Sequence, residues 1–225
     1  MVTEIDELNK EIISCNKCSR LINFRKKILQ NKRKQFVNQS YWGKPITGFG
    51  DVKAKMLFVG LAPAAHGATR TGRVFTGDKS SEFLYKCLFN ANISNQNTSE
   101  HIHDGLKLRN AFITAALKCV PPEDKPKKNE LVNCFNFFEQ EINLLKNLKV
   151  IIALGKIAFD SCVEFYMNNY NLKIKYKFKH GKSYNLPNKV LLVGCYHPSP
   201  RNVNTGRIDE KNMTNLFKKI KNKIN

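Results

Sequence analysis

Four of the seven cysteines are spaced so that they could hold a metal group. Cys15 and Cys18 form a C-x-x-C pair in a polar stretch, Cys119 stands just before two prolines, and Cys134 follows fifteen residues later. Four thiolates can bind Zn²⁺ or an iron–sulfur cluster, and the spacing neither decides between these groups nor excludes unrelated thiols. The remaining three lie among apolar residues, where we expect buried thiols: Cys87, Cys162 and Cys195.

Two loops carry the other residues that could do chemistry. The first reads GLAPAAHG at residues 60–67 and TGRVFTGD at residues 71–78. Its small side chains would let backbone N–H groups approach a ligand closely. Its spacing matches neither G-x-G-x-x-G nor the phosphate-binding P-loop, so a nucleotide cofactor is poorly supported. Phe75 could stack on a flat base or cap the core, and Asp78 could be the N-cap of the following helix.

The second loop reads HPSPRNVNTGR at residues 197–207 and directly follows an apolar run. Its prolines would hold His197 in place, where a neutral imidazole can donate a hydrogen bond to charge that develops on a leaving group. Arg201, Asn202 and Arg207 suit contacts with phosphates or base edges, and the stiff segment could wedge into a duplex. A proline-rich turn with a structural histidine is the simpler alternative.

The elements that must position these loops alternate between apolar strands and amphipathic helices. Buried strands are predicted over residues 55–60, 111–117, 150–155 and 190–194. Helical spacing of apolar residues predicts helices over residues 5–30, 80–92, 131–145, 156–169 and 213–224. This order predicts an α/β fold with a mostly parallel four-stranded sheet covered on both faces. Ligands bind beyond the carboxyl ends of such strands, which directs attention to the loops after Gly60, Leu117 and Cys195.

Length, composition and charge limit the class of protein. The 225 residues are 42% hydrophobic and 25% charged, which fits one folded domain over residues 1–225. No apolar run approaches the roughly 20 residues of a membrane-spanning helix, and the first residues lack the pattern of a secretory signal. The net charge of +20 favours a polyanionic partner such as nucleic acid. An AT-rich genome that inflates the lysine content is the alternative.

Together the two loops resemble the signature segments of the type B, or family 5, uracil-DNA glycosylases. The resemblance rests on GLAPAAHGATRTGRVFTGD at residues 60–78 and HPSPRNVNTGR at residues 197–207. It extends to the C-x-x-C pair, to YWGKPITGFGD at residues 41–51 and to ITAALKCVPP at residues 113–122. The five segments stand in the family's order, and the region from the first to the last spans most of the chain.

The resemblance implies a three-layer α/β/α sandwich, in agreement with the predicted elements. It also implies a [4Fe–4S] cluster bound partly by the N-terminal helical segment, with four ligands: Cys15, Cys18, Cys119 and Cys134. In the family the cluster is taken to be structural, so loss of one thiolate should destabilise the fold before it affects the chemistry.

The reaction that the resemblance implies is hydrolysis of the bond between a damaged base and deoxyribose. The nucleotide must first be flipped out of the duplex into a pocket. His197 would donate a hydrogen bond to a uracil oxygen as the base leaves, and Asp78 would stabilise the sugar cation or orient water. Phe75 would stack on the base.

Other residues would contact the base or the DNA. The base edge would be read by backbone groups around Gly60, Ala62, Ala64 and Ala65. Because alanines stand where many related glycosylases carry a carboxylate or amide, Asp78 is the best remaining carboxylate. Asp124 falls where relatives often carry Asn, which puts its role in doubt. DNA contacts are expected from Ser199, Arg201, Asn202 and Arg207.

The leading expectation is a glycosylase that removes uracil, and other deaminated bases such as hypoxanthine, to start base-excision repair. Its partners would be double- and single-stranded DNA. We expect a monomer in a prokaryotic cytoplasm, associated with the nucleoid. A non-catalytic protein that binds damaged DNA or abasic sites is the alternative, and an iron–sulfur electron carrier is a weaker one.

Overall fold

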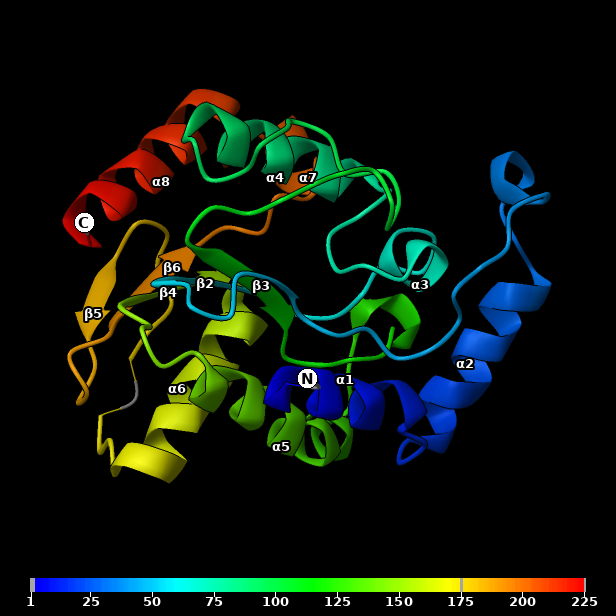
Figure 1. Cartoon of the computed structure of the whole chain (residues 1–225), viewed down its shortest axis with the longest axis horizontal. Coiled ribbons are helices and arrows are strands. Elements are labelled where there is room, and N and C mark those ends of the chain that lie inside the picture. The colour runs from blue at the N-terminus through cyan, green and yellow to red at the C-terminus, as the bar shows by residue number, and fades with distance from the viewer. Residues whose placement is uncertain (1–2, 175, 225) are drawn as a thin grey trace.

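The computed structural model describes residues 3–174 and 176–224, which form three layers around a six-stranded sheet (Figure 1). Its centre consists of four parallel strands in the order β3 (Ala111–Ala115), β2 (Met56–Gly60), β4 (Val150–Leu154) and β6 (Leu191–Cys195). Every residue of β2, β3 and β4 is buried, as expected for strands covered on both faces. The four predicted strands and their parallel arrangement are confirmed.

The sheet is wider than predicted because a short antiparallel strand is added at each edge. β1 (Phe49–Gly50) pairs with β3, and β5 (Ser183–Asn185) pairs with β6. With two and three residues, these strands are too short to produce the alternation of apolar and polar residues that marks a strand in sequence.

Helices cover both faces of the sheet. Figure 1 shows one layer made of α4 (Lys79–Asn90), α7 (Pro200–Asn204) and α8 (Glu210–Ile224). The opposite layer contains α5 (Lys128–Leu144) and α6 (Lys156–Tyr170), with α1 (Glu4–Ser14) packed on α5. The shorter elements are α3 (Ala68–Thr71) and two 3₁₀ turns, η1 (Lys34–Phe36) and η2 (Pro122–Asp124). The predicted α/β/α sandwich is confirmed.

The N-terminal segment is two helices rather than the single predicted one. α1 ends at Ser14 and α2 (Ser19–Gln30) begins at Ser19, so the C-x-x-C pair lies in the break between them. Arg20 of α2 binds both carboxylate oxygens of Glu130 on α5, at 2.7 Å each. This bidentate pair fastens α2 to α5.

Aromatic contacts hold the helices on the two faces of the sheet. Phe58 of β2 meets Phe217 of α8 edge to face, with ring centroids 5.3 Å apart. On the opposite face, Phe159 of α6 contacts Phe178 and Tyr184, at 5.7 and 5.8 Å between centroids. Phe58, Phe217 and Phe159 are fully buried, and burial of each of these rings contributes about 1.5–3 kcal/mol.

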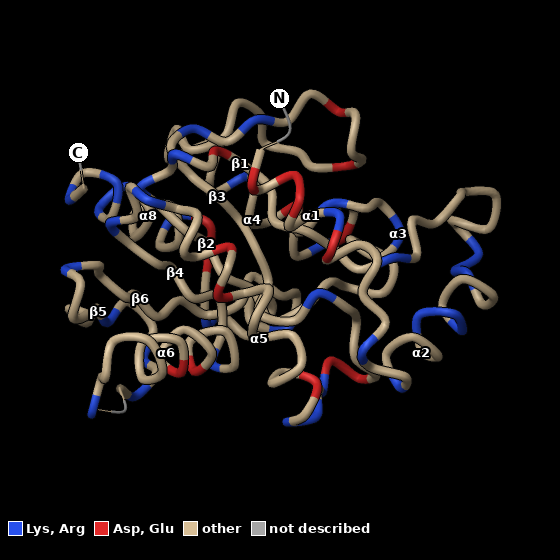
Figure 2. The backbone as a smooth tube through the Cα atoms, turned by 60° about the horizontal axis from the view of Figure 1, so that its bottom comes forward, with Lys and Arg blue, Asp and Glu red and all other residues tan. Residues whose placement is uncertain are grey.

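The surface carries the basic excess that the composition requires. Figure 2 shows Lys and Arg residues along α2 and α8, whereas α1 carries acidic residues in its first turn. Within residues 3–174 and 176–224, none of the helices combines the length and the apolar character needed to cross a membrane.

Candidate active site

A cavity of about 390 Å³ lies at the carboxyl ends of the parallel strands. The loops after β2, β3 and β6 all contribute to it, as the rule for open parallel sheets predicts. Its lining consists of Leu61, Ala62, Pro63, Ala64, Phe75, Asp78, Ser80, Asp124, His197, Ser199 and Pro200. Segments more than 100 residues apart in the chain therefore meet around one space.

Phe75 and His197 face each other in this cavity. Their ring centroids are 5.9 Å apart, and the ring planes are inclined by 32°. The end of β2 makes room for the Phe75 ring, because a Cβ atom on Gly60 would lie only 2.7 Å from its Cε2 atom. Gly60 therefore shapes the cavity through Phe75 and does not line it.

Hydrogen bonds within its own loop fix the backbone of His197. Its carbonyl oxygen accepts hydrogen bonds from the Ser199 backbone N–H at 2.8 Å and from the Asn202 side-chain amide at 2.9 Å. Burial lowers the pKa of the imidazole to about 4. The ring is therefore neutral at physiological pH, and one nitrogen carries a proton that it can donate.

Asp78 is both the N-cap of α4 and a residue of the cavity wall. Its Oδ1 atom accepts from the Ser81 backbone N–H at 2.9 Å, which makes Asp78 the N-cap of α4, and the residue also lines the cavity. Its other oxygen lies so close to Gly67 that a Cβ atom there would be 2.0 Å away. Burial raises the pKa of the Asp78 carboxyl above its ordinary value, although the hydrogen bond from Ser81 opposes the shift.

Residues 61–64, directly after β2, contribute only apolar side chains to the cavity wall. Ala62 and Ala64 line the space, whereas Ala65 packs against the separate cluster around Ile28 and Tyr41. The Ala65 side chain is therefore not part of the cavity wall, and the prediction that backbone groups of this segment read a base edge stays a prediction. A base edge at this wall would meet backbone atoms and methyl groups.

Asp124 brings a second carboxylate to the cavity from η2, where it is solvent-exposed and has a left-handed backbone (φ 55°). Sequence reasoning missed Ser80 and Pro200 as lining residues. Their positions in the sequence could have pointed to them, because Ser80 lies two residues after Asp78 and Pro200 directly follows Ser199.

The predicted DNA-contacting residues differ in their surroundings. Ser199 is the N-cap of α7 and lines the cavity, whereas Arg201 and Arg207 are exposed and do not line it. The Asn202 amide points inward and supports the His197 carbonyl. The structure thus places Asn202 as an anchor of the loop.

The four candidate metal-binding cysteines come together at one site. Cys15, Cys18, Cys119 and Cys134 line the same small hollow beneath the N-terminal helices. Burial raises the pKa of Cys119 to about 11 and of Cys134 to about 12. N–H groups approach three sulfur atoms: Arg25 Nη1 to Cys119 at 3.2 Å, the Lys118 backbone N to Cys134 at 3.2 Å, and Asn133 Nδ2 to Cys18 at 3.6 Å. Among the described residues, no three side chains of His, Cys, Asp or Glu are placed to hold a single metal ion, although these four thiols line one hollow.

Comparisons with known proteins agree on one family. The family model described as the uracil DNA glycosylase superfamily matches residues 47–222. A type-5 uracil-DNA glycosylase of Mycobacterium leprae is 39% identical over 218 residues, which cover 96% of this chain and 94% of that protein. One from Thermus thermophilus is 40% identical over 197 residues, 88% of each chain. A type-4 uracil-DNA glycosylase of Sulfurisphaera tokodaii is 26% identical over 96% of this chain and 83% of its own. This chain belongs to the uracil-DNA glycosylase superfamily and, within it, to the type-5 enzymes.

Proposed function

We propose that this enzyme hydrolyses the N-glycosidic bond of deoxyuridine in DNA and so starts base-excision repair. The observation that carries the proposal is the meeting of Phe75, His197 and Asp78 around one cavity. Type-5 relatives at 36–40% identity over most of the chain support the same activity.

Each of the three residues has a physical role in the proposed reaction. A flipped uracil stacks on the Phe75 ring, which gives a planar base a contact that does not depend on its exact substituents. The neutral His197 donates a hydrogen bond to the base oxygen on which negative charge develops as the bond breaks. The Asp78 carboxylate stabilises the cationic sugar or orients the attacking water.

We infer that the cavity also accepts other deaminated bases, such as hypoxanthine. Its volume of about 390 Å³ exceeds that of a single pyrimidine, and residues 61–64 contribute only apolar side chains. An enzyme rejects a wrong base most strongly when that base leaves a polar group of the site without a hydrogen bond. The side chains of residues 61–64 have no polar group that a purine could leave unpaired.

We also propose that the four convergent cysteines hold a [4Fe–4S] cluster. The donor set fits, because four thiols surround one hollow and three of them have N–H groups nearby that would stabilise negatively charged sulfur. The cluster would supply a structural link: it would join the break between α1 and α2 to α5 and to the segment after β3. No step of the reaction depends on it.

We propose that the enzyme acts as a monomer on double- and single-stranded DNA, in the cytoplasm of a prokaryote and in association with its nucleoid. The relatives come from bacteria and archaea, and the net charge of +20 favours binding to a polyanion.

The test of the activity is release of base from uracil- and hypoxanthine-containing oligonucleotides, read as alkali-labile abasic sites. The wild-type protein should release uracil, and Asp78→Asn should be much slower. Asparagine preserves the N-cap of α4, so this variant separates the charge of Asp78 from its capping role. Binding of uracil-containing DNA without any excision by iron-loaded protein would contradict the proposal and favour a non-catalytic damage-binding protein.

The test of the cluster is the iron and acid-labile sulfide content of purified protein. Cys134→Ala should lose both and unfold at a lower temperature. Cys162→Ala is the matched control, because Cys162 is a buried thiol of α6 remote from the other four. Equal iron content in the two variants would rule out Cys134 as a ligand.

A further inference from the structure

The turn that presents Phe75 to the cavity has a strained backbone. Phe75 has a φ of 47°, in the left-handed region that a bulky side chain rarely adopts. Such a conformation persists only where the surrounding structure holds it in place. The neighbours of Phe75 on both sides, Val74 and Thr76, are buried.

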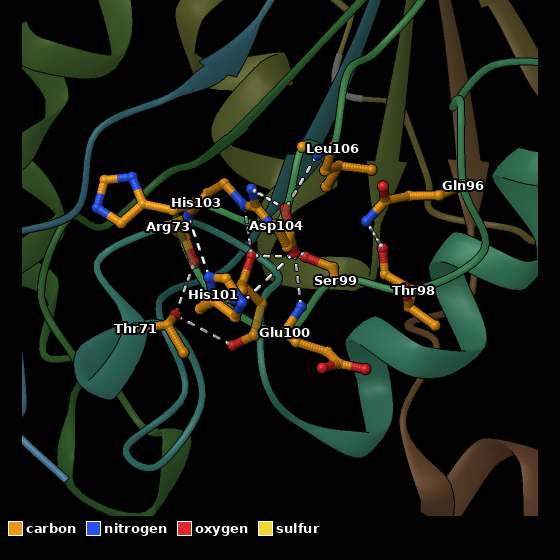
Figure 3. A network of polar contacts seen from close by, with 12 residues as sticks. Thr71, Arg73, Gln96, Thr98, Ser99, Glu100, His101, His103, Asp104 and Leu106 are labelled. Atoms are coloured by element: carbon orange, nitrogen blue, oxygen red, sulfur yellow. Dashed lines mark hydrogen bonds and ion pairs between the residues drawn. The ribbon is translucent and has the colours of Figure 1, made fainter.

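Arg73 fastens this turn to a distant segment through a buried ion pair. Its Nη1 and Nη2 atoms donate to the two carboxylate oxygens of Asp104, at 2.8 and 2.6 Å (Figure 3). The Arg73 and Asp104 side chains are only 4% and 9% exposed. The Nε atom of Arg73 donates to Thr76 Oγ1 at 2.9 Å, so the same guanidinium closes the turn across Phe75.

Asp104 is itself held firmly by the segment that carries it. Its carboxylate accepts from the backbone N–H groups of Glu100 and Leu106, at 2.8 and 3.0 Å. Burial opposes ionisation of Asp104, but the hydrogen bonds from Arg73 and from these N–H groups prevail and hold its pKa below the ordinary value. The carboxylate is therefore a fixed, charged anchor.

Ser99 ties the far side of the turn to the same segment. Its hydroxyl lies 2.7 Å from Thr76 Oγ1, and its carbonyl oxygen accepts from the Gly77 backbone N–H at 2.8 Å. This segment belongs to the long connection between α4 and β3, and ordered connections of such length usually have a functional reason. Arg73, Ser99 and Asp104 do not line the cavity.

We propose that Arg73 and Asp104 are positioning residues for base excision, and that the α4–β3 connection acts as a brace for the strained Phe75 turn. The brace sets the distance between Phe75 and His197 without touching the substrate. The inference rests on the proposed glycosylase activity for its kinetic readout, and its geometric content can be tested apart from that activity.

The experiment compares single-turnover excision of uracil with binding of a duplex whose 2′-fluorinated deoxyuridine resists hydrolysis. Asp104→Asn should lower the excision rate constant by about 10- to 100-fold, since misplacement of a reacting group by about 1 Å has effects of that size. Its Kd should change by less than about threefold, because phosphate contacts supply most of the affinity. Ser99→Ala keeps the ion pair and should give a smaller rate loss, so it serves if Asp104→Asn does not fold.

Two controls separate positioning from simple loss of stability. Asp160→Asn removes a carboxylate from an ion pair on α6, and Val163→Ala weakens the core on the opposite face of the sheet. Both should keep the wild-type rate at temperatures where they are folded. An unchanged rate in folded Asp104→Asn and Ser99→Ala would overturn the proposal, as would an equal loss in Val163→Ala.

The fluorescence of Trp42, the only tryptophan, gives a readout that needs no catalysis. Its indole lies beside Gly72, next to Arg73, where a Cβ atom would be 3.2 Å from the ring. Asp104→Asn should shift its emission, whereas Asp160→Asn should not. Wild-type protein that releases no uracil would count against the proposed function alone, and the shift would then still support the brace. If the Trp42 emission of Asp104→Asn does not shift, the brace proposal is overturned.

Discussion

Replacement of Gly60 by alanine should impair excision through the Phe75 ring. The new Cβ atom would lie 2.7 Å from Cε2 and 2.8 Å from Cζ of Phe75. Carbon atoms pack best at about 3.5–4.0 Å, so the ring would have to move by about 1 Å. The next neighbour, the Thr114 carbonyl oxygen, would be 3.8 Å away, an ordinary contact that leaves β2 undisturbed.

A shift of that size in a group that orients the base should lower the excision rate about 100-fold. The cost in stability should stay within the range of about 1–3 kcal/mol that is usual for one extra carbon in a packed core. Single-turnover release of uracil, together with thermal unfolding, measures both quantities.

A double-mutant cycle shows whether the effect passes through Phe75. Gly60→Ala should cost little in a Phe75→Ala background, because the ring it displaces is already gone. Rate losses that simply add in the double variant would refute the reasoning. So would a Gly60→Ala rate within about twofold of the wild type, since a 1 Å displacement would then have no kinetic consequence.

Three further predictions concern His197, the DNA surface and the core. His197→Ala should slow excision about 100-fold with little change in melting temperature, and unchanged kinetics would remove His197 from the mechanism. Because burial lowers its pKa to about 4, the wild-type rate should show no inflection near the ordinary histidine value of about 6.5. Between about pH 6.5 and pH 4 the unfolded chain binds a proton at His197 that the folded protein excludes, so wild-type stability falls as the pH is lowered through this interval. His197→Ala should flatten this slope in melting temperature against pH, with little change at neutral pH. Arg201→Gln and Arg207→Gln should each reduce the slope of log Kd against log salt by about 0.9, and an unchanged slope would show that the exposed guanidinium makes no phosphate contact. Glu141→Gln would leave the buried Lys118 ammonium without its charged partner and should cost about 3–5 kcal/mol in urea unfolding; a loss below about 1 kcal/mol would contradict a buried pair.

The sequence predicted those parts of the fold that depend on long apolar patterns. A short, continuous apolar run such as residues 150–154 is typical of a strand buried on both faces of a sheet. Helices between successive strands favour a parallel order. The edge strands β1 and β5 were not predicted, because each is very short and forms only by pairing with a strand that is distant in the sequence. The break between α1 and α2 was not predicted, because the helical spacing of apolar residues continues on both sides of it.

Most residues that line the cavity were named from the sequence, but the structure that supports them was not. The rule for strand ends directed attention to residues 61–64 and 197–200, and the resemblance to the glycosylase family grouped Phe75 and Asp78 with His197. The packing of Ala65 against the cluster around Ile28 and Tyr41 and the hydrogen bond from Asn202 to His197 both depend on loop geometry, which the spacing of residues in the sequence does not predict. The Arg73–Asp104 pair joins two loops, and single charged residues in loops carry no signal of their partners.

The packing of the N-terminal helices has a consequence for synthesis of the chain. α1 and α2 rest on α5, through contacts such as Arg20 with Glu130, so their partners are translated more than 100 residues later. At about 5–20 residues per second, this delay lasts several seconds or more. During that interval the thiols of Cys15 and Cys18 have no folded surroundings. The N-terminal helices therefore cannot reach their native place until α5 has been made, and a reducing environment would protect Cys15 and Cys18 during that interval.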